Sequence, residues 1–97
     1  RPGEAAIRIV PGLDPDGLHR LAARLTEATD GLCAVLTPSE KGTGYCLARA
    51  NGDVRALTKA LNTALSGRGG GKPGICQGSC AATPEEVEKF LKENHEL

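Results

Sequence analysis

The stretch that decides the fold reads Gly67-Arg68-Gly69-Gly70-Gly71-Lys72-Pro73-Gly74. Glycine loses more conformational freedom on folding than any other residue, so a simple turn would not need this many glycines. Something is therefore expected to approach the main chain closely. Consecutive N–H groups without side chains can form a concave nest for a phosphate or carboxylate, and Arg68 and Lys72 supply positive charge beside it. The alternative interpretation is a flexible surface connector.

The stretch matches neither of the common glycine-rich nucleotide motifs. A P-loop follows a strand, opens a helix and ends in Gly-Lys followed by Ser or Thr, whereas Pro73 follows Lys72 here. The spacing also differs from G-x-G-x-x-G. We therefore predict a loop over residues 68–74 that seats an anion on its main chain.

A basic helix is predicted immediately before this loop. Asp53 is a good N-cap, and Gly67 is a typical residue to end the helix. Apolar residues recur along one side of the segment between them, and the other side offers Arg55, Lys59 and Asn62. Cations on this helix would extend a positive surface that starts at the glycine loop.

The rest of the chain predicts four strands and two further helices. Strands are expected at 6–10, 32–36, 44–50 and 75–81, with a turn at 38–43 that joins the middle pair into a hairpin. Asp14 and Pro15 begin a helix that runs to about Ala28, and Thr83, Pro84 and Glu86 begin the last one with a capping box. This order predicts a single domain of the α/β (α+β) class, a small mixed β-sheet with helices packed on it.

Charge is segregated along a chain whose net charge is zero. Residues 41–76 carry six Lys or Arg against one Asp, a net charge of +5, while residues 1–40 carry −2 and residues 77–97 carry −3. A polyanion would be drawn to the basic middle third. The alternative is a solvated helix face that pairs with the acidic C-terminal segment.

Composition excludes several classes of function. With 97 residues the chain is one small domain, and only Tyr45 and Phe90 are aromatic, which argues against a surface that stacks nucleic-acid bases on rings. No apolar run is long enough for a membrane span, so no membrane partner is expected. The N-terminus, Arg1-Pro2-Gly3-Glu4, has neither an initiator Met nor a secretion signal. We expect a cytoplasmic fragment of a longer protein.

The four cysteines could form two disulfides, but free thiols are the preferred interpretation because nothing marks the chain as secreted. Cys76 and Cys80 are spaced C-x3-C, whereas structural zinc sites usually use C-x2-C pairs with two more ligands. The histidines, His19 and His95, are solitary. Neither a metal site nor a cofactor is expected, and no residue is assigned a catalytic role.

At the glycine stretch the chain resembles the DHH-associated domain at the C-terminus of alanyl-tRNA synthetases, alanyl-tRNA editing proteins and DHH-type phosphoesterases. The shared signature is a glycine run, a basic residue and Pro, followed a few positions later by Gln-Gly or a pair of small residues. It is matched here by Gly69, Gly70, Gly71, Lys72, Pro73, Gln77 and Gly78. The order of the preceding strand, hairpin and helix also fits, so the resemblance spans nearly the whole chain.

Two branches of the family compete. Phosphoesterase members tend to carry a His after the glycines, where this chain has Lys72-Pro73, and Gln77 resembles the synthetase and editing branch. Ser79 departs from that branch, which often has glycine there. The H-x3-H and C-x3-H zinc pairs of the editing site and the Asp-His-His motif of the phosphoesterases are absent from this sequence. The resemblance therefore implies a domain that binds and positions its substrate while another domain does the chemistry.

These observations give three hypotheses. The leading one is an accessory nucleic-acid-binding domain that positions tRNA of the alanyl type for a synthetase-related catalytic or editing domain elsewhere in the parent protein. The second is the substrate-binding domain of a DHH-type phosphoesterase that acts on nucleotides or short oligonucleotides. The third is a homodimer in which the basic surface meets the acidic side of a helix containing Glu85, Glu86 and Glu88. The predicted nucleic-acid-binding residues are Arg55, Lys59, Arg68, Gly69, Gly70, Gly71, Lys72, Gln77 and Gly78.

Overall fold

One mixed sheet of five strands organises the domain. The computed structural model describes residues 5–97, so the prediction drawn from Arg1-Pro2-Gly3-Glu4 falls outside the described residues. The elements are β1 (Ala6–Ile9), α1 (Pro15–Leu25), β2 (Cys33–Ser39), β3 (Gly42–Ala48), α2 (Arg55–Ala64), β4 (Gly67–Lys72), β5 (Ile75–Cys80) and α3 (Pro84–Asn94). The strand order is β1-β2-β3-β5-β4, with β1 parallel to β2 and the other neighbours antiparallel. The predicted fold class, a mixed sheet with helices packed on it, is confirmed.

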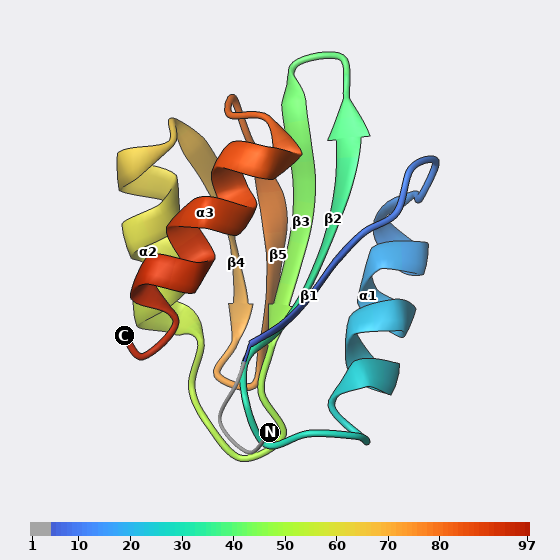
Figure 1. Cartoon of the computed structure of the whole chain (residues 1–97), viewed down its shortest axis with the longest axis vertical. Helices are drawn as coiled ribbons and strands as arrows, with labels where there is room; N and C mark the ends of the chain where they lie inside the picture. The colour runs from blue at the N-terminus through green and yellow to red at the C-terminus, as the bar shows by residue number, and fades with distance from the viewer. Residues whose placement is uncertain (1–4) are drawn as a thin grey trace.

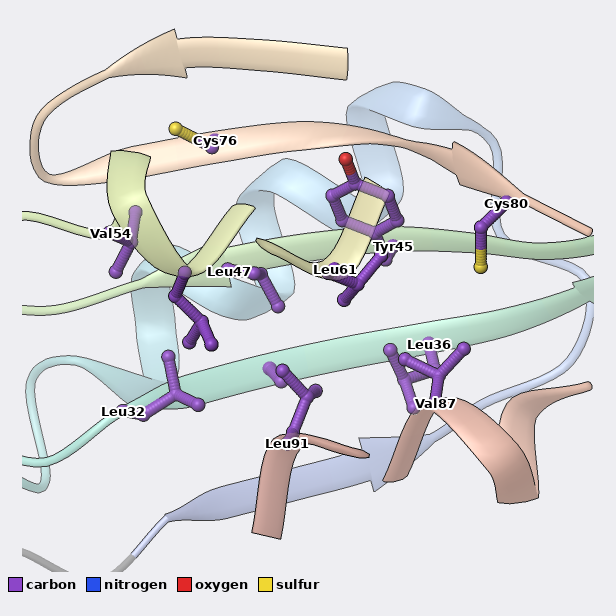
Figure 2. Packing of buried hydrophobic residues seen from close by; sticks show 12 residues of the cluster. Leu32, Leu36, Tyr45, Leu47, Val54, Leu61, Cys76, Cys80, Val87 and Leu91 are labelled. Carbon is purple, nitrogen blue, oxygen red and sulfur yellow. The ribbon is translucent and has the colours of Figure 1, made fainter. Parts of the chain in front are cut away.

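Helices cover both faces of the sheet, and each face has its own apolar core. Figure 1 shows α2 and α3 on one face and α1 on the other. Figure 2 shows the larger core, in which Tyr45 lies in one cluster with leucines of β2, β3, α2 and α3. The smaller core joins Leu18 and Ala22 of α1 to Val35 and Cys46 of the sheet. Alternate residues of each strand therefore point to different helices.

The predicted loop over residues 68–74 is wrong, because Gly67–Lys72 form the edge strand β4. Only the two residues Pro73 and Gly74 make the turn to β5, and Lys72 pairs directly with Ile75. Main-chain pairing with β5 overrides the low strand preference of glycine. A nest of consecutive amides aimed at a ligand does not form, since in an edge strand alternate N–H groups point toward the neighbouring strand and away from it.

The capping residues predicted from the sequence are confirmed for α1 and α3 but not for α2. Asp14 accepts a hydrogen bond from the Gly17 amide at 2.7 Å, and Thr83 and Glu86 form the predicted capping box. Asp53 is not the N-cap of α2, which has Val54 in that position. The Asp53 carboxylate nevertheless accepts from the Arg55 amide at 2.9 Å, just outside the helix.

The end of α2 also differs from prediction. Ser66, at φ 55°, takes the left-handed conformation that Gly67 was expected to supply. Gly67 serves close packing instead, because a Cβ there would lie 2.6 Å from the Asn62 side-chain oxygen and 2.8 Å from the Cys80 Cβ. Helix α1 ends at Leu25 and is followed by turns, short of the predicted Ala28.

The predicted hairpin is confirmed, but its turn is tighter than residues 38–43. Pro38 pairs with Thr43 and Ser39 with Gly42, which leaves Glu40 and Lys41 as the turn. The four cysteines, Cys33, Cys46, Cys76 and Cys80, are free and buried. Within residues 5–97 no helix is both long and apolar enough to cross a membrane.

Candidate nucleic-acid interface

The side chains of β4 divide between the two faces of the sheet. Ile75, opposite Lys72, packs into the core beneath α1, whereas Cys76, opposite Gly71, belongs to the core beneath α2 and α3. Because side chains alternate along a strand, Arg68, Gly70 and Lys72 occupy the α1 side. All three are exposed. Since α1 packs mainly on β2 and β3, it leaves this outer edge uncovered (Figure 1).

The close approach expected at the glycines is made by the main chain of the paired strand and by Tyr45 of β3. A Cβ on Gly69 or on its partner Gly78 would lie 2.8 Å from the Tyr45 hydroxyl. In Figure 2 this hydroxyl points toward β5. Gly69 also has a φ of 153°, which side chains rarely adopt. These two glycines are therefore explained by the packing of the domain itself.

Gly70 is different. A Cβ on Gly70 would have no atom of the described residues within 4 Å, and its φ lies outside the left-handed range. The fold therefore does not require glycine at this position. Gly70 lies between Arg68 and Lys72 on an exposed face, where its lack of a side chain leaves the main chain open to an external molecule.

Tyr45 also connects the sheet to α2. Its hydroxyl donates to the Asn62 side-chain oxygen at 2.7 Å, and the Asn62 nitrogen donates to the Gly69 carbonyl at 3.3 Å. This chain of hydrogen bonds fixes the amide orientation of Asn62 and holds α2 against the edge strand. Burial raises the pKa of Tyr45 to about 12, against the smaller lowering effect of its bond to Asn62.

A groove of about 420 Å³ lies between α2 and β4. Its α2 wall carries Arg55, Lys59, Asn62 and Thr63, and its other wall is main chain of the glycine strand. Lys59 is exposed and forms no ion pair with the residues that the structure describes. The groove thus combines positive charge with exposed hydrogen-bonding groups of the edge strand.

Arg55 is already paired. Its guanidinium donates to both carboxylate oxygens of Asp53, with the Nη2 to Oδ2 contact at 2.7 Å. The pair lowers the pKa of Asp53 and raises the pKa of Arg55, mainly through these hydrogen bonds. A phosphate at Arg55 would have to compete with Asp53. Both groups are exposed, so such an exchange has little desolvation cost.

Gln77 does not reach the groove. It projects to the α1 side, where its side-chain nitrogen donates to the Pro15 carbonyl. It lines a second hollow of about 770 Å³, together with His19, Gly44 and Gly78. The hydrogen bond to α1 leaves the Gln77 side-chain oxygen as its free polar atom among residues 5–97.

Comparison with known proteins identifies the family. The model of the DHHA1 domain matches residues 3–97. This chain belongs to the DHHA1 domain family. Among solved structures, the C-Ala domain from Aquifex aeolicus alanyl-tRNA synthetase is similar to the whole of this chain and to 96% of that chain, with a TM-score of 0.83 at 19% sequence identity. A search of curated proteins gives no match.

In this DHHA1 domain the predicted site residues surround one strand without converging on one point. Arg68, Gly70 and Lys72 line the α1 side of β4, and Arg55 and Lys59 lie across the groove on its other side. Gly69 and Gly71 form main chain between them. Gln77 and Gly78 lie one strand inward. Every predicted residue is thus on β4 or on an element beside it.

Sequence reasoning missed the role of Tyr45, which no local pattern indicates. Asn62 was recognisable as a polar residue on the basic side of α2, but its partners belong to distant segments. Among the described residues, no group of three or more His, Cys, Asp or Glu gathers that could hold a metal ion. The cations and the exposed main-chain groups of β4 and its neighbours can bind an anion.

Proposed function

We propose that this DHHA1 domain binds RNA through its edge strand and positions tRNA for a catalytic or editing domain elsewhere in the parent protein. The observation that carries the proposal is the open main chain at Gly70, with Arg68 and Lys72 on either side of it on the same face. Neither cation forms an ion pair with any of residues 5–97. Both are therefore available to phosphates.

The geometry suits an extended sugar–phosphate backbone. Arg68 and Lys72 are four residues apart on one strand, about 13 Å at the usual rise of an antiparallel strand. That separation is too large for one phosphate and allows two contacts along a nucleic-acid strand. Gly70 between them lets the backbone approach the main chain, and Lys59 adds charge from across the edge. Contacts of this kind fix the position of an RNA without reading its sequence.

The choice of tRNA rests on two arguments. The similar solved domain belongs to an alanyl-tRNA synthetase. Gln77 resembles the synthetase and editing branch of the family. Where phosphoesterase members tend to carry a His after the glycines, this chain has Lys72-Pro73. A domain that holds tRNA in a fixed place raises the rate of a reaction at a separate site by orienting the reacting end.

The test compares tRNA binding by the wild-type chain with binding by a double variant, Arg68→Ala with Lys72→Ala. Because two phosphate contacts are lost, we expect affinity to fall about tenfold or more, and the slope of log K against log salt to shrink by about two. The control, Lys89→Ala with Lys92→Ala, removes the same formal charge from α3 on the other face of the sheet, where Lys92 is paired with Glu88. It should leave the salt slope nearly unchanged.

Two results would count against the proposal. Equal losses in the test and control variants would mean that net charge alone attracts the RNA. Tighter binding of dinucleotides or short oligonucleotides than of tRNA would favour the phosphoesterase alternative. Circular dichroism of each variant should show an unchanged fold, because both cations are exposed.

A further inference from the structure

The β2–β3 turn, the start of β4 and the end of β5 lie at the same end of the sheet (Figure 1). A third hollow, of about 860 Å³, lies among these segments. It lies outside the groove between α2 and β4. It is lined by Ser39, Glu40, Lys41, Ser66, Arg68, Ser79, Cys80 and Ala81. Arg68 is therefore shared between the exposed face of β4 and this hollow.

The walls of the hollow are held in place by the end of β5. A Cβ on Gly42, at φ 142°, would collide with the Cys80 carbonyl and lie 2.7 Å from the Ala81 carbonyl carbon. Next to it, the Thr43 hydroxyl donates to the Ala82 carbonyl at 2.7 Å. The turn that carries Lys41 is thus fastened to the chain leaving β5, although turns of hairpins are commonly mobile.

The wall formed by the junction of α2 and β4 is also hydrogen-bonded to the chain that leaves β5. The Ala81 amide donates to the Leu65 carbonyl at 3.2 Å, where α2 gives way to β4. The following residue, Ser66, adopts φ 55°, a conformation that costs a non-glycine residue about 1 kcal/mol or more. The structure therefore maintains a strained serine at the rim of a hollow that also contains two cations.

The polar groups of the hollow suit a phosphate. Lys41 and Arg68 supply two positive charges against one negative charge from Glu40, and none of the three forms an ion pair within residues 5–97. Three serines from different segments, Ser39, Ser66 and Ser79, also line the hollow, and a serine hydroxyl can donate a hydrogen bond to an oxyanion.

We propose that this hollow is a second binding subsite for a phosphodiester group, with Lys41 as its principal cation. The inference rests on the proposed RNA binding and extends it. An RNA strand would run along β4 from Lys72 to Arg68 and continue over the end of the sheet to the β2–β3 turn. The negative charge of Glu40 repels the phosphodiester group and so weakens its binding.

Two single substitutions with opposite expected effects test the subsite. Lys41→Ala should weaken tRNA binding about three- to tenfold and reduce the salt slope by about one. Glu40→Gln should strengthen binding, because it removes a like charge from the hollow. Lys41→Arg should restore most of the affinity. Lys89→Ala and Glu93→Gln make the same charge changes on α3, away from the hollow, and serve as matched controls.

A titration with inorganic phosphate, followed by amide chemical shifts, locates the subsite independently of RNA. Shifts should concentrate at Lys41, Ser66 and Ser79 and should disappear in Lys41→Ala. If Lys41→Ala and Glu40→Gln behave like their controls while the double variant of Arg68 and Lys72 loses binding, the subsite is refuted and the proposed function stands. If the double variant also binds normally, the proposed function itself has failed.

Discussion

At the scale of single residues, the glycines of β4 occur for different structural reasons. Gly69 leaves space for the main chain of β5 and for the Tyr45 hydroxyl, so its role is internal, whereas Gly70 meets nothing within the described chain. A sequence shows the same residue type in both places and cannot distinguish them. The distinction matters because only an unexplained glycine points to a ligand.

A pair of alanine substitutions separates the two roles. Gly69→Ala should destabilise the fold by about 1–3 kcal/mol, because the new Cβ would crowd the Gln77 carbonyl and the Tyr45 hydroxyl at an unfavourable φ. Gly70→Ala should leave stability unchanged or raise it by about 0.4–1 kcal/mol, since the unfolded chain loses entropy. Urea unfolding measures both values.

The same Gly70→Ala variant should bind tRNA more weakly, because a methyl group would keep the sugar–phosphate backbone away from the main chain. The binding assay is the one used for Arg68 and Lys72. A stable Gly70→Ala domain with full affinity would show that no ligand approaches the strand at this point.

At the scale of elements, the sequence predicted the helices better than the glycine segment. The capping residues Asp14 and Thr83 are local signals, and the structure uses both. The strand β4 has no such signal, because four of its six residues are glycine and its pairing partners lie in β5. Its cations were recognised from the sequence, but the face that each one occupies follows from the register and could not be predicted.

The junction between α2 and β4 provides a test of the strain at Ser66. Ser66→Gly should stabilise the domain by about 0.5–1 kcal/mol, because glycine adopts a positive φ without steric cost, although part of the gain is offset by greater freedom in the unfolded chain. The midpoint of urea unfolding measures the effect. A lower midpoint would mean that the serine side chain contributes more to the fold than its backbone costs.

At the scale of the whole molecule, the presence of a mixed sheet and the order of every element except β4 followed from the sequence. The insertion of β5 between β3 and β4 did not, and this insertion puts the glycine segment at the edge. Strand order depends on contacts between distant segments, and a single sequence does not reveal them. Arg68 and Lys72 therefore lie on an edge strand for a reason that composition alone could not supply.

The buried core should make the domain sensitive to alkali. Burial is the main cause that raises the pKa of Cys46 from 9.0 to about 12 and that of Tyr45 from 10.0 to about 12. The unfolded chain releases these protons at lower pH than the folded one, so the free energy of unfolding should fall as pH rises from about 9 to about 12. Below about pH 9 these two groups should contribute no pH dependence.

Urea unfolding at several pH values checks this expectation. Cys46→Ala and Tyr45→Phe should each lower stability at neutral pH, and each should also flatten the alkaline slope, because the titrating group is gone. A slope that is unchanged in both variants would assign the alkaline loss to other groups.

The position of Arg68 and Lys72 on an uncovered strand has a consequence for solubility. Unpaired strand edges tend to recruit other strands and so promote aggregation, and lysine or arginine on the edge counters this through repulsion. If two copies of the chain met along β4, their cations would be brought together, which disfavours a shared sheet. The charges proposed to attract a polyanion would thus also keep unliganded copies from joining edge to edge.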